Sequence, residues 1–378
     1  MIISTAAGLF CEAGSFHIDP WAPVERAVVT HAHSDHASPG SSNYLCAAPG
    51  DRVLRRRLPD ARVEILPYGE RVTIGDARVS FHPAGHILGS AQIRVEHRGE
   101  IWVVSGDYKR QADPTCAAFE PVPCHTFITE ATFALPIYTW DPTGAVVKDI
   151  LSWWRANRGD DRPSVLFCYV LGKAQRVLAE IGDRADGPIH LHGAMAAMTE
   201  AYRDAGIAMP PAERITEGMR GKTLARSLVL APLSARGTPW MKRLPRASVA
   251  FASGLMRVRG VRRQRAFDRG FALSDHADWG ALLSTIAETG ASRVLVTHGW
   301  SESLARFLAE ERGLETGTIR TAFEGETGEL TEPAEPASQA KVAEPGPPAE
   351  RREPAKPAER AEPAKRAGHP HPGDKGRS

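Results

Sequence analysis

Three histidines and an aspartate stand within six consecutive residues near the start of this chain, in the segment His31-Ala32-His33-Ser34-Asp35-His36. Neutral imidazole and carboxylate are ligands that Zn²⁺ and Mn²⁺ prefer in proteins. A solvated polar turn is the alternative, but it would use three of the 14 histidines of the chain in one short loop. The hexapeptide therefore predicts a metal site, and its number of ligands favours two metals.

Three further metal-binding side chains stand next to glycines at the ends of predicted strands. His86 is flanked by Gly85, Asp107 follows Gly106, and His298 precedes Gly299. A glycine lets the backbone bend so that the neighbouring side chain can be aimed. Each of the three, taken alone, is more often a loop or capping residue. Together with the hexapeptide, they supply the ligands that a two-metal hydrolytic site requires.

Short strands must carry these ligands in the first part of the chain. The hexapeptide follows the apolar run 26–30, which is typical of a strand that ends in a ligand loop. Up to about residue 135, further β-type runs are separated by glycine-bearing turns, at 63–66, 78–81, 91–95 and 101–104. This first region is therefore expected to be rich in strands.

Helices and strands alternate from about residue 140. A helical stripe at 146–154 precedes a strand at 164–170, a helix that opens at Gly172 and a strand at 188–192. This alternation predicts an α/β unit with a parallel sheet. The region 266–330 adds a helix at 279–286, a strand at 293–297 and a helix around 304–308. These last elements could complete the first domain, which would make the middle of the chain an insertion.

Composition narrows the class of protein. The 378 residues are 42% hydrophobic and 24% charged, as expected for a globular protein. The net charge is only +2, so the overall charge does not indicate a binding partner. The five cysteines form no CxxC pair, which predicts buried thiols in a reducing compartment. There is no signal-peptide pattern and no apolar run of about 18 residues, so we expect a cytoplasmic protein that does not interact with membranes.

The composition changes abruptly near Thr331. Residues 331–378 contain ten prolines and no aromatic residue, with nine Lys/Arg against eight Asp/Glu. Such a segment cannot bury enough apolar surface to offset the entropy cost of ordering it. We expect a disordered tail, which is either a tether for a partner or a passive extension.

The order His31-x-His33-x-Asp35-His36, then His86, then Asp107 resembles the metallo-β-lactamase superfamily. The resemblance implies an α/β protein with an αββα sandwich that holds two metals at one edge. The first metal would be held by His31, His33 and His86, and the second by Asp35, His36 and a later histidine, with Asp107 as the bridge. Asp19 resembles the early aspartate that supports the ligand loops in this superfamily.

The later histidine points to the β-CASP nucleases within that superfamily, because His298 comes long after Asp107, beyond the predicted α/β insertion. This group includes the pre-mRNA 3′-end cleavage endonuclease, RNase J and the DNA crosslink-repair nucleases. Counterparts of its motifs are Thr129-Glu130-Ala131-Thr132, Ser274-Asp275-His276-Ala277-Asp278, Val296-Thr297-His298-Gly299 and the helix start Leu171-Gly172-Lys173-Ala174-Gln175. The phrases Ile18-Asp19-Pro20-Trp21 and Leu273-Ser274-Asp275-His276 most resemble the bacterial ligase-associated DNA exonucleases, which are associated with an ATP-dependent DNA ligase and a large helicase.

The resemblance implies these domains: a metallo-β-lactamase domain at 1–137, an inserted β-CASP cap at 138–265, and the completing part of the first domain at 266–330, before the tail. It also implies two divalent metal ions, Zn²⁺ or Mn²⁺. Water held between them would supply hydroxide to attack the phosphodiester, and His276, oriented by Glu130, would be the general acid. The alternative for the second motif is that Asp275, His276 and Asp278 cap the helix at Trp279.

Basic residues near the second motif are candidates for contacts with the phosphate backbone. They are Arg257, Arg259, Arg262, Arg263, Arg265 and Arg269, with Lys173 at a helix start. A solvated charged face and an ordinary helix start are the alternatives. His192 ends a predicted strand of the cap, where packing is the simpler explanation.

The favoured function is a DNA exonuclease in DNA repair, working with a ligase and helicase system. Two alternatives stay open: a β-CASP ribonuclease, exo or endo, and a non-catalytic nucleic-acid-binding subunit. The presence of every expected ligand argues against the silent subunit. A hydrolase of small esters is disfavoured, because a small substrate does not need a whole cap domain over the site.

Overall fold

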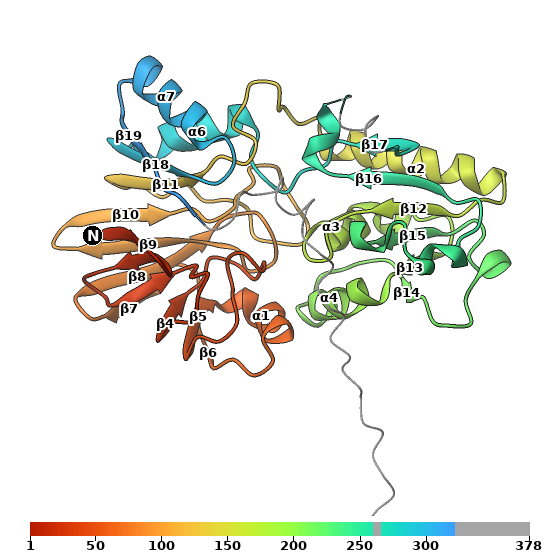
Figure 1. Ribbon diagram of the computed structural model, residues 1–378, viewed down its shortest axis with the longest axis horizontal. Helices are drawn as coiled ribbons and strands as arrows, with labels where there is room; N and C mark the ends of the chain where they lie inside the picture. Colours follow the sequence, from red (N-terminus) through yellow and green to blue (C-terminus); the bar gives the residue numbers. More distant parts are fainter. Residues whose placement is uncertain (259, 261–265, 322–378) are drawn as a thin grey trace, which may run out of the picture. The chain divides into compact units, whose positions relative to one another are not determined.

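This computed structural model describes residues 1–258, 260 and 266–321. They form three β-sheets and the helices that cover them (Figure 1). The described residues all belong to the same compact unit of the chain. The prediction of a mixed α/β fold is confirmed. The predicted tail at 331–378 lies outside the described residues.

The first sheet has the strand order β1-β2-β3-β4-β5-β6. Its strands are β1 (Ile2–Thr5), β2 (Gly8–Cys11), β3 (Phe16–Ile18), β4 (Arg26–Val28), β5 (Asn43–Ala47) and β6 (Val63–Leu66). β4 was predicted to run to Thr30 but ends at Val28, because the Thr30 amide donates to the Asp19 carboxylate. The hexapeptide therefore lies in a loop beyond the strand.

The second sheet is completed by strands from the far end of the described chain. Its order is β19-β18-β11-β10-β9-β8-β7. The strands are β7 (Arg71–Ile74), β8 (Ala77–Pro83), β9 (Ala91–His97), β10 (Glu100–Val104), β11 (Thr126–Glu130), β18 (Arg293–Thr297) and β19 (Glu315–Thr318). β18 pairs in parallel with β11, and Glu130 stands opposite Thr297. Their carboxyl ends therefore meet at one edge of the sheet.

These two sheets pack on each other and carry helices on their outer faces. Their shared core contains Leu45 of the first sheet and Phe81 and Ile93 of the second, all buried. α1 (Asp51–Arg57) packs outside the first sheet, and α6 (Trp279–Thr289) and α7 (Ser301–Arg312) pack outside the second. Each large apolar side chain buried in these layers contributes about 1.5–3 kcal/mol.

The third sheet is parallel throughout, with the order β14-β13-β15-β12-β16-β17 (Figure 1). The strands are β12 (Ser164–Phe167), β13 (Ile189–Leu191), β14 (Glu213–Arg214), β15 (Leu228–Ala231), β16 (Ser248–Ala252) and β17 (Arg269–Phe271). The sequence predicts this parallel α/β unit correctly. β12 is shorter than the predicted strand 164–170, because the chain turns towards Gly172, which has a φ of +88°.

The two faces of the third sheet are covered differently. The helices α2 (Thr143–Gly159), α3 (Lys173–Ile181) and α4 (Gly193–Asp204) pack on one face. Short 3₁₀ turns cover the other face, at Gly221–Thr223, Leu233–Ala235 and Pro239–Arg243. Since all strands are parallel, their carboxyl ends lie along one edge, which is where α/β sheets bind ligands.

Two predictions from composition can be compared with the described residues. All five cysteines are free, and four of them are buried, as predicted for inert thiols. None of the helices among the described residues is long and apolar enough to cross a bilayer.

Candidate metal centre

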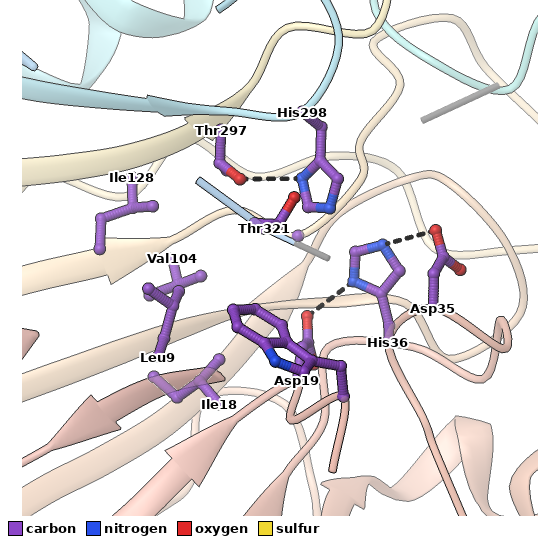
Figure 2. A pocket seen from close by; sticks show the side chains of 12 residues that line it. Leu9, Ile18, Asp19, Asp35, His36, Val104, Ile128, Thr297, His298 and Thr321 are labelled. Atoms are coloured by element: carbon purple, nitrogen blue, oxygen red, sulfur yellow. Dashed lines mark hydrogen bonds and ion pairs between the residues drawn. The ribbon is translucent and has the colours of Figure 1, made fainter. Parts of the chain in front are cut away.

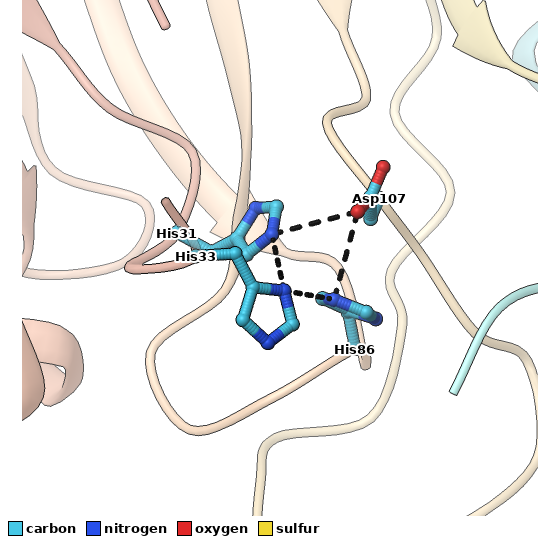
Figure 3. A group of neighbouring side chains, drawn as sticks. All are labelled: His31, His33, His86 and Asp107. Atoms are coloured by element: carbon cyan, nitrogen blue, oxygen red, sulfur yellow. Dashed lines mark hydrogen bonds and ion pairs between the residues drawn. The ribbon is translucent and has the colours of Figure 1, made fainter. Parts of the chain in front are cut away.

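Three imidazoles and a carboxylate converge in front of the second sheet (Figure 3). The His33 Nδ1 atom lies 3.0 Å from His31 Nε2 and 3.1 Å from His86 Nε2. Asp107 Oδ2 lies 3.5 Å from His31 Nε2 and 3.7 Å from His86 Nε2. Four ligand atoms thus face a common point, as the first metal of the predicted site requires.

The other nitrogen of two of these rings is held by a backbone carbonyl from the third-sheet region. His33 Nε2 is 3.1 Å from the oxygen of Leu171, and His86 Nδ1 is 2.8 Å from the oxygen of Asp275. A carbonyl can only accept, so each of these nitrogens donates and the opposite nitrogen presents a lone pair to the cluster. Residues far along the chain therefore fix both ring orientations.

Thr30 anchors the hexapeptide, although only its place directly before His31 marks it in the sequence. Its hydroxyl donates to Asp19 Oδ2 at 2.6 Å and lies 3.0 Å from His31 Nδ1. The same Asp19 oxygen accepts from His36 Nδ1 at 2.7 Å. Asp19 thus supports the ligand loop, as the resemblance implies. A Cβ at Gly106 would stand 2.6 Å from the Thr30 side chain, so this glycine allows the close approach.

The second predicted ligand group consists of Asp35, His36 and His298, and it is more open to solvent than the first group (Figure 2). His36 Nε2 lies 3.4 Å from Asp107 Oδ2 and 3.6 Å from Asp35 Oδ2. The ring of His298 stacks on that of His36 with centroids 5.4 Å apart, and its Nδ1 lies 3.0 Å from Thr297 Oγ1. The structure therefore brings all seven predicted ligands to one edge, with one carboxylate oxygen of Asp107 between the two groups.

The electrostatics of the site suit a cation. Burial lowers the pKa of His31 and of His86 well below the usual histidine value, and burial also lowers the pKa of His33. Burial would lower the pKa of His36 as well, but the Asp107 carboxylate and its acidic neighbours raise it well above the usual value. All three imidazoles are therefore neutral, and those of His33 and His86 present an inward lone pair, which is the state in which histidine binds a metal.

One buried atom shows that the donor set fits a metal. Among the described residues, His36 Nε2 has no hydrogen-bond partner, although it is buried and points towards two carboxylates. A buried nitrogen of this kind costs free energy unless a ligand satisfies it. Imidazole and carboxylate are the donors that Zn²⁺ and Mn²⁺ take, and the seven residues therefore fit two divalent ions.

A hydrogen-bonded pair, His276 and Glu130, lies beside the candidate ligands. His276 Nδ1 lies 2.9 Å and 3.1 Å from the two oxygens of Glu130, whose Oε1 also accepts from the Tyr108 amide at 2.7 Å. Glu130 is 1% exposed, so its carboxylate is fixed rather than solvated. The ring of His276 lies 4.8 Å from that of His86. Because Glu130 holds Nδ1, a transferable proton on His276 would be carried by Nε2.

The helix-capping alternative for the second motif applies to one residue only. Asp278 caps α6, since its Oδ1 accepts from the Ala281 amide at 2.9 Å. The Asp275 carboxylate instead contacts Arg176, and His276 contacts Glu130. The side chains of the motif therefore have three different roles: Asp278 caps a helix, Asp275 forms an ion pair, and His276 bonds to Glu130.

Five buried charges join the third sheet's helices to this motif, and the sequence does not single them out as a group. They are Lys109, Asp113, Lys173, Arg176 and Asp275. Their side chains are between 0% and 5% exposed. Arg176 donates to the oxygen of Ser274 at 2.6 Å and to Asp275 Oδ1 at 3.0 Å. The loop that carries His276 is thus held from α3.

The predicted nucleic-acid contacts have mixed positions. The Lys173 ammonium is buried, 3.7 Å from Asp275 Oδ2 and 4.6 Å from the Tyr169 ring centroid, so a phosphate contact there stays a prediction. Arg257 is exposed and pairs with Asp141 at 3.2 Å. Four of the predicted contacts lie outside the described residues, namely Arg259, Arg262, Arg263 and Arg265, and Arg269 is exposed on β17.

Comparisons with known proteins relate the chain to enzymes of nucleic acids. No family model matches. The chain is 34% identical over 334 residues to a protein named "Probable DNA ligase" from Opitutus terrae, a match that covers 86% of this chain and 32% of that protein. It is 30% identical over 122 residues to endoribonuclease YSH1 of Gibberella zeae and 26% identical over 119 residues to that of Eremothecium gossypii. The YSH1 matches cover 31% of this chain and 14% and 15% of those proteins. The chain thus spans about a third or less of each relative.

A solved structure supports the fold alone. A protein of unknown function from Enterococcus faecalis V583 aligns with a TM-score of 0.53 at 14% identity, over 80% of each chain. Nuclease-related similarity and a candidate metal cluster therefore stand together in one α/β chain.

Proposed function

We propose that this chain is a two-metal phosphodiesterase of the β-CASP group of the metallo-β-lactamase superfamily, acting as a DNA exonuclease. One observation carries the proposal: the ligand group around Asp107 and the pair Glu130–His276 lie side by side at one sheet edge. The similarity to proteins named DNA ligase and endoribonuclease supports a nucleic-acid substrate.

The proposed domains follow the sheets, except at the boundary between residues 265 and 266. Residues 1–137 and 266–330 would form the metallo-β-lactamase domain, because β18 and β19 belong to the sheet of β7–β11. Residues 138–265 would form most of the β-CASP cap around the third sheet. Because β17 (Arg269–Phe271) also belongs to that sheet, the sheet order supports a cap that continues through β17, beyond the boundary at 265. The interrupted order of the second sheet supports this division.

Two divalent ions, when bound, would activate a water and stabilise the charge that develops on the phosphate. His31, His33, His86 and Asp107 would hold one ion, and Asp35, His36, His298 and Asp107 the other. The carbonyls of Leu171 and Asp275 keep the imidazoles in the ligating orientation before any ion arrives.

His276 would supply the proton that the leaving sugar oxygen needs. Glu130 accepts from His276 Nδ1 and stabilises the protonated ring, so that Nε2 carries the proton to be transferred. As the phosphorus–oxygen bond to the leaving sugar breaks, this proton moves to that oxygen, and the attacking water oxygen forms the new bond to phosphorus. Glu130 itself stays a positioning residue, because its oxygens are occupied by His276 and the Tyr108 amide.

The decisive experiment incubates the purified chain with Mn²⁺ or Zn²⁺ and end-labelled single-stranded DNA, duplex DNA and RNA. We expect DNA to be cut to mononucleotides from an end. Equal or faster cutting of RNA would refute the DNA assignment and favour the second candidate, a ribonuclease, which the YSH1 similarity supports. Internal fragments would replace the exonuclease with an endonuclease. Binding of nucleic acid without cleavage under any metal would favour a non-catalytic subunit.

Two substitutions separate the general acid from the ligands. His276→Ala should retain its metals and lose most turnover, about 10²–10⁴-fold. Asp107→Ala should first lose metal content, since one oxygen serves both groups. His97→Ala is the control, because its Nδ1 bonds to the Asp76 carbonyl at the exposed end of β9. Metal loss in His276→Ala, or full occupancy in Asp107→Ala, would reverse the two roles.

A role in DNA repair with an ATP-dependent ligase and a helicase is part of the same proposal, supported by the ligase-named relative. Co-purification of the chain with a ligase from its own host tests it, and a repair role predicts that deletion of the gene sensitises cells to DNA damage. Normal survival of the deletion strain after strand-breaking damage would contradict it.

A further inference from the structure

The carboxyl edge of the third sheet faces the ligand cluster. The chain leaves β12 through Leu171, whose oxygen contacts His33, and leaves β17 through Asp275, whose oxygen contacts His86. A Cβ at Gly172 would stand 4.0 Å from His33 Nε2. Because all six strands are parallel, the loops after the other strands lie along the same edge as these two contacts.

Two strands further along this edge, an aromatic and basic cluster is found. His192 follows β13, and its ring lies 4.9 Å from that of Trp240, at an angle of 63°. Arg214 ends β14, and its guanidinium lies next to Gly193: a Cβ added to this glycine would be 3.5 Å from the guanidinium. His192 and Trp240 are half-buried, and Arg214 is exposed. An indole, an imidazole and a guanidinium therefore share one partly open spot, which we call the edge cluster.

The loops that lead from β14 to β15 and from β15 to β16 are rich in basic residues. Residues 214–246 contain eight lysines and arginines but one acidic residue, in a chain whose net charge is only +2. The basic residues are Arg214, Arg220, Lys222, Arg226, Arg236, Lys242, Arg243 and Arg246. Two of them, Arg226 and Arg246, stand just before β15 and β16 and therefore lie at the opposite, amino edge of the sheet. Arg243 donates to the carbonyls of Thr216 and Glu217, so the two loops over this face of the sheet are joined. The loop after β14 and the loop after β15, which carry the other basic residues, are thus held together.

The chemistry of the edge cluster fits an unpaired nucleobase and its phosphate. His192 Nδ1 already accepts from the Ala194 amide, which leaves its ring face and that of Trp240 as the apolar surfaces. Aromatic rings flanked by arginines in a positive field are how proteins bind single strands without reading their sequence. Packing explains the inner side of Trp240, which lies against the core of this face, but it gives no reason for the surrounding charge.

We propose that a single-stranded nucleic acid runs from the metal centre along the carboxyl edge of the third sheet, with a base on Trp240 and His192 and a phosphate at Arg214. This proposal rests on the proposed nuclease function. β13 is two strands from β12, which is about 10 Å. That span corresponds to about three nucleotides at the ~3.4 Å rise of a stacked strand.

The first test measures binding of single-stranded DNA without metal, by fluorescence anisotropy. Trp240→Ala should weaken binding of a long strand about tenfold or more, and Trp240→Phe should largely restore it. Arg214→Gln should reduce the slope of log K against log salt by about 0.7. Arg78→Gln is the matched control, because Arg78 lies on β8 and pairs with Glu96. Unchanged affinity and salt dependence in both cluster variants would refute the strand path.

The second test uses substrate length. A dinucleotide cannot reach from the metal centre to the edge cluster, whereas a long oligonucleotide can. Trp240→Ala should therefore raise KM for the long strand, leave kcat unchanged and leave dinucleotide cleavage unaltered. A misfolded variant would lose both activities, and the urea midpoint of Trp240→Phe checks the fold. Equal defects on both lengths, or none on the long strand, would overturn the proposal.

These outcomes separate the two proposals. If the unsubstituted chain cleaves no nucleic acid under any metal, the nuclease function fails, whatever the binding data show. If it cleaves normally but Trp240→Ala behaves like the unsubstituted chain on long strands, only the strand path fails.

Discussion

Replacing Asp275 by asparagine removes one of two carboxylates from the group of five buried charges behind the candidate metal centre. Its oxygens lie 3.0 Å from Arg176, 3.7 Å from Lys173 and 3.9 Å from Lys109. Burial would raise the pKa of Asp275, but Lys173, Lys109 and Arg176 hold it well below the usual value. The side chain is therefore ionised at neutral pH, and an amide cannot replace its charge.

The cost follows from the burial of the partners. After the substitution, three cations with fully buried side chains face the single carboxylate of Asp113. Removing one partner of a buried ion pair typically costs about 3–5 kcal/mol, because the remaining charges stay desolvated. Asp186 provides the contrast, since it also pairs with two arginines, Arg155 and Arg158, but is 38% exposed. Asp186→Asn should cost below about 1 kcal/mol.

Urea unfolding of the two variants and the unsubstituted chain measures both costs. Metal content of the folded Asp275→Asn variant should be unchanged, because His86 bonds to the backbone oxygen of residue 275, which the substitution keeps. A loss of free energy of unfolding no larger than that of Asp186→Asn would refute the argument. Such a result would mean that water or rearrangement compensates the buried charges.

Four further predictions concern other parts of the chain. Gly299→Ala should lower the free energy of unfolding by about 1–2 kcal/mol or more, because φ at this position is +59° and the new Cβ would stand 2.4 Å from the Ala131 oxygen. Gly144→Ala is the control: this glycine faces open space on α2, so the substitution should be neutral or stabilising in the same urea assay. Burial raises the pKa of Cys46 and Cys168 to about 12, so a thiol reagent at pH 8 should modify them only after unfolding; rapid reaction of the native chain would contradict this. Mn²⁺ or Zn²⁺ at a hundredfold excess over its Kd should add about 2.7 kcal/mol to stability, seen as a rise in Tm that EDTA reverses; an unchanged Tm would argue against a metal site. Deleting residues 331–378 should leave cleavage of a short oligonucleotide intact, and a large loss of rate would assign the tail a part in the reaction.

The sequence predicts well where the candidate ligands stand, because hydrophobic runs and glycines mark the strand ends that precede them. β6 and β18 have the predicted bounds, and His86 and Asp107 lie at the predicted bends. The predicted strand bounds are wrong where a side chain replaces a neighbouring strand as hydrogen-bond partner of the backbone. β4 ends two residues early because the Thr30 amide bonds to the Asp19 carboxylate.

The buried charges could not be predicted from sequence, because an isolated lysine or arginine has the pattern of a solvated residue wherever it stands. Lys109 and Arg176 become a group only when β10 and α3 are brought together by the fold. The edge cluster was missed for a related reason. Arg214 and Trp240 belong to separate loops of the chain, and the parallel sheet is what places them at one edge.

The pairing of β18 with β11 has a consequence for the order in which the protein is made. During synthesis, β11 emerges long before the strand that covers its edge, since Glu130 pairs with Thr297 and the whole third sheet is translated between them. Parallel contacts over such separations form slowly, and an uncovered strand edge promotes aggregation. Three histidines of the first ligand group can meet well before His298 is translated. A fragment that stops before β18 leaves the edge of β11 uncovered, and we expect it to aggregate more readily than a chain that contains β18.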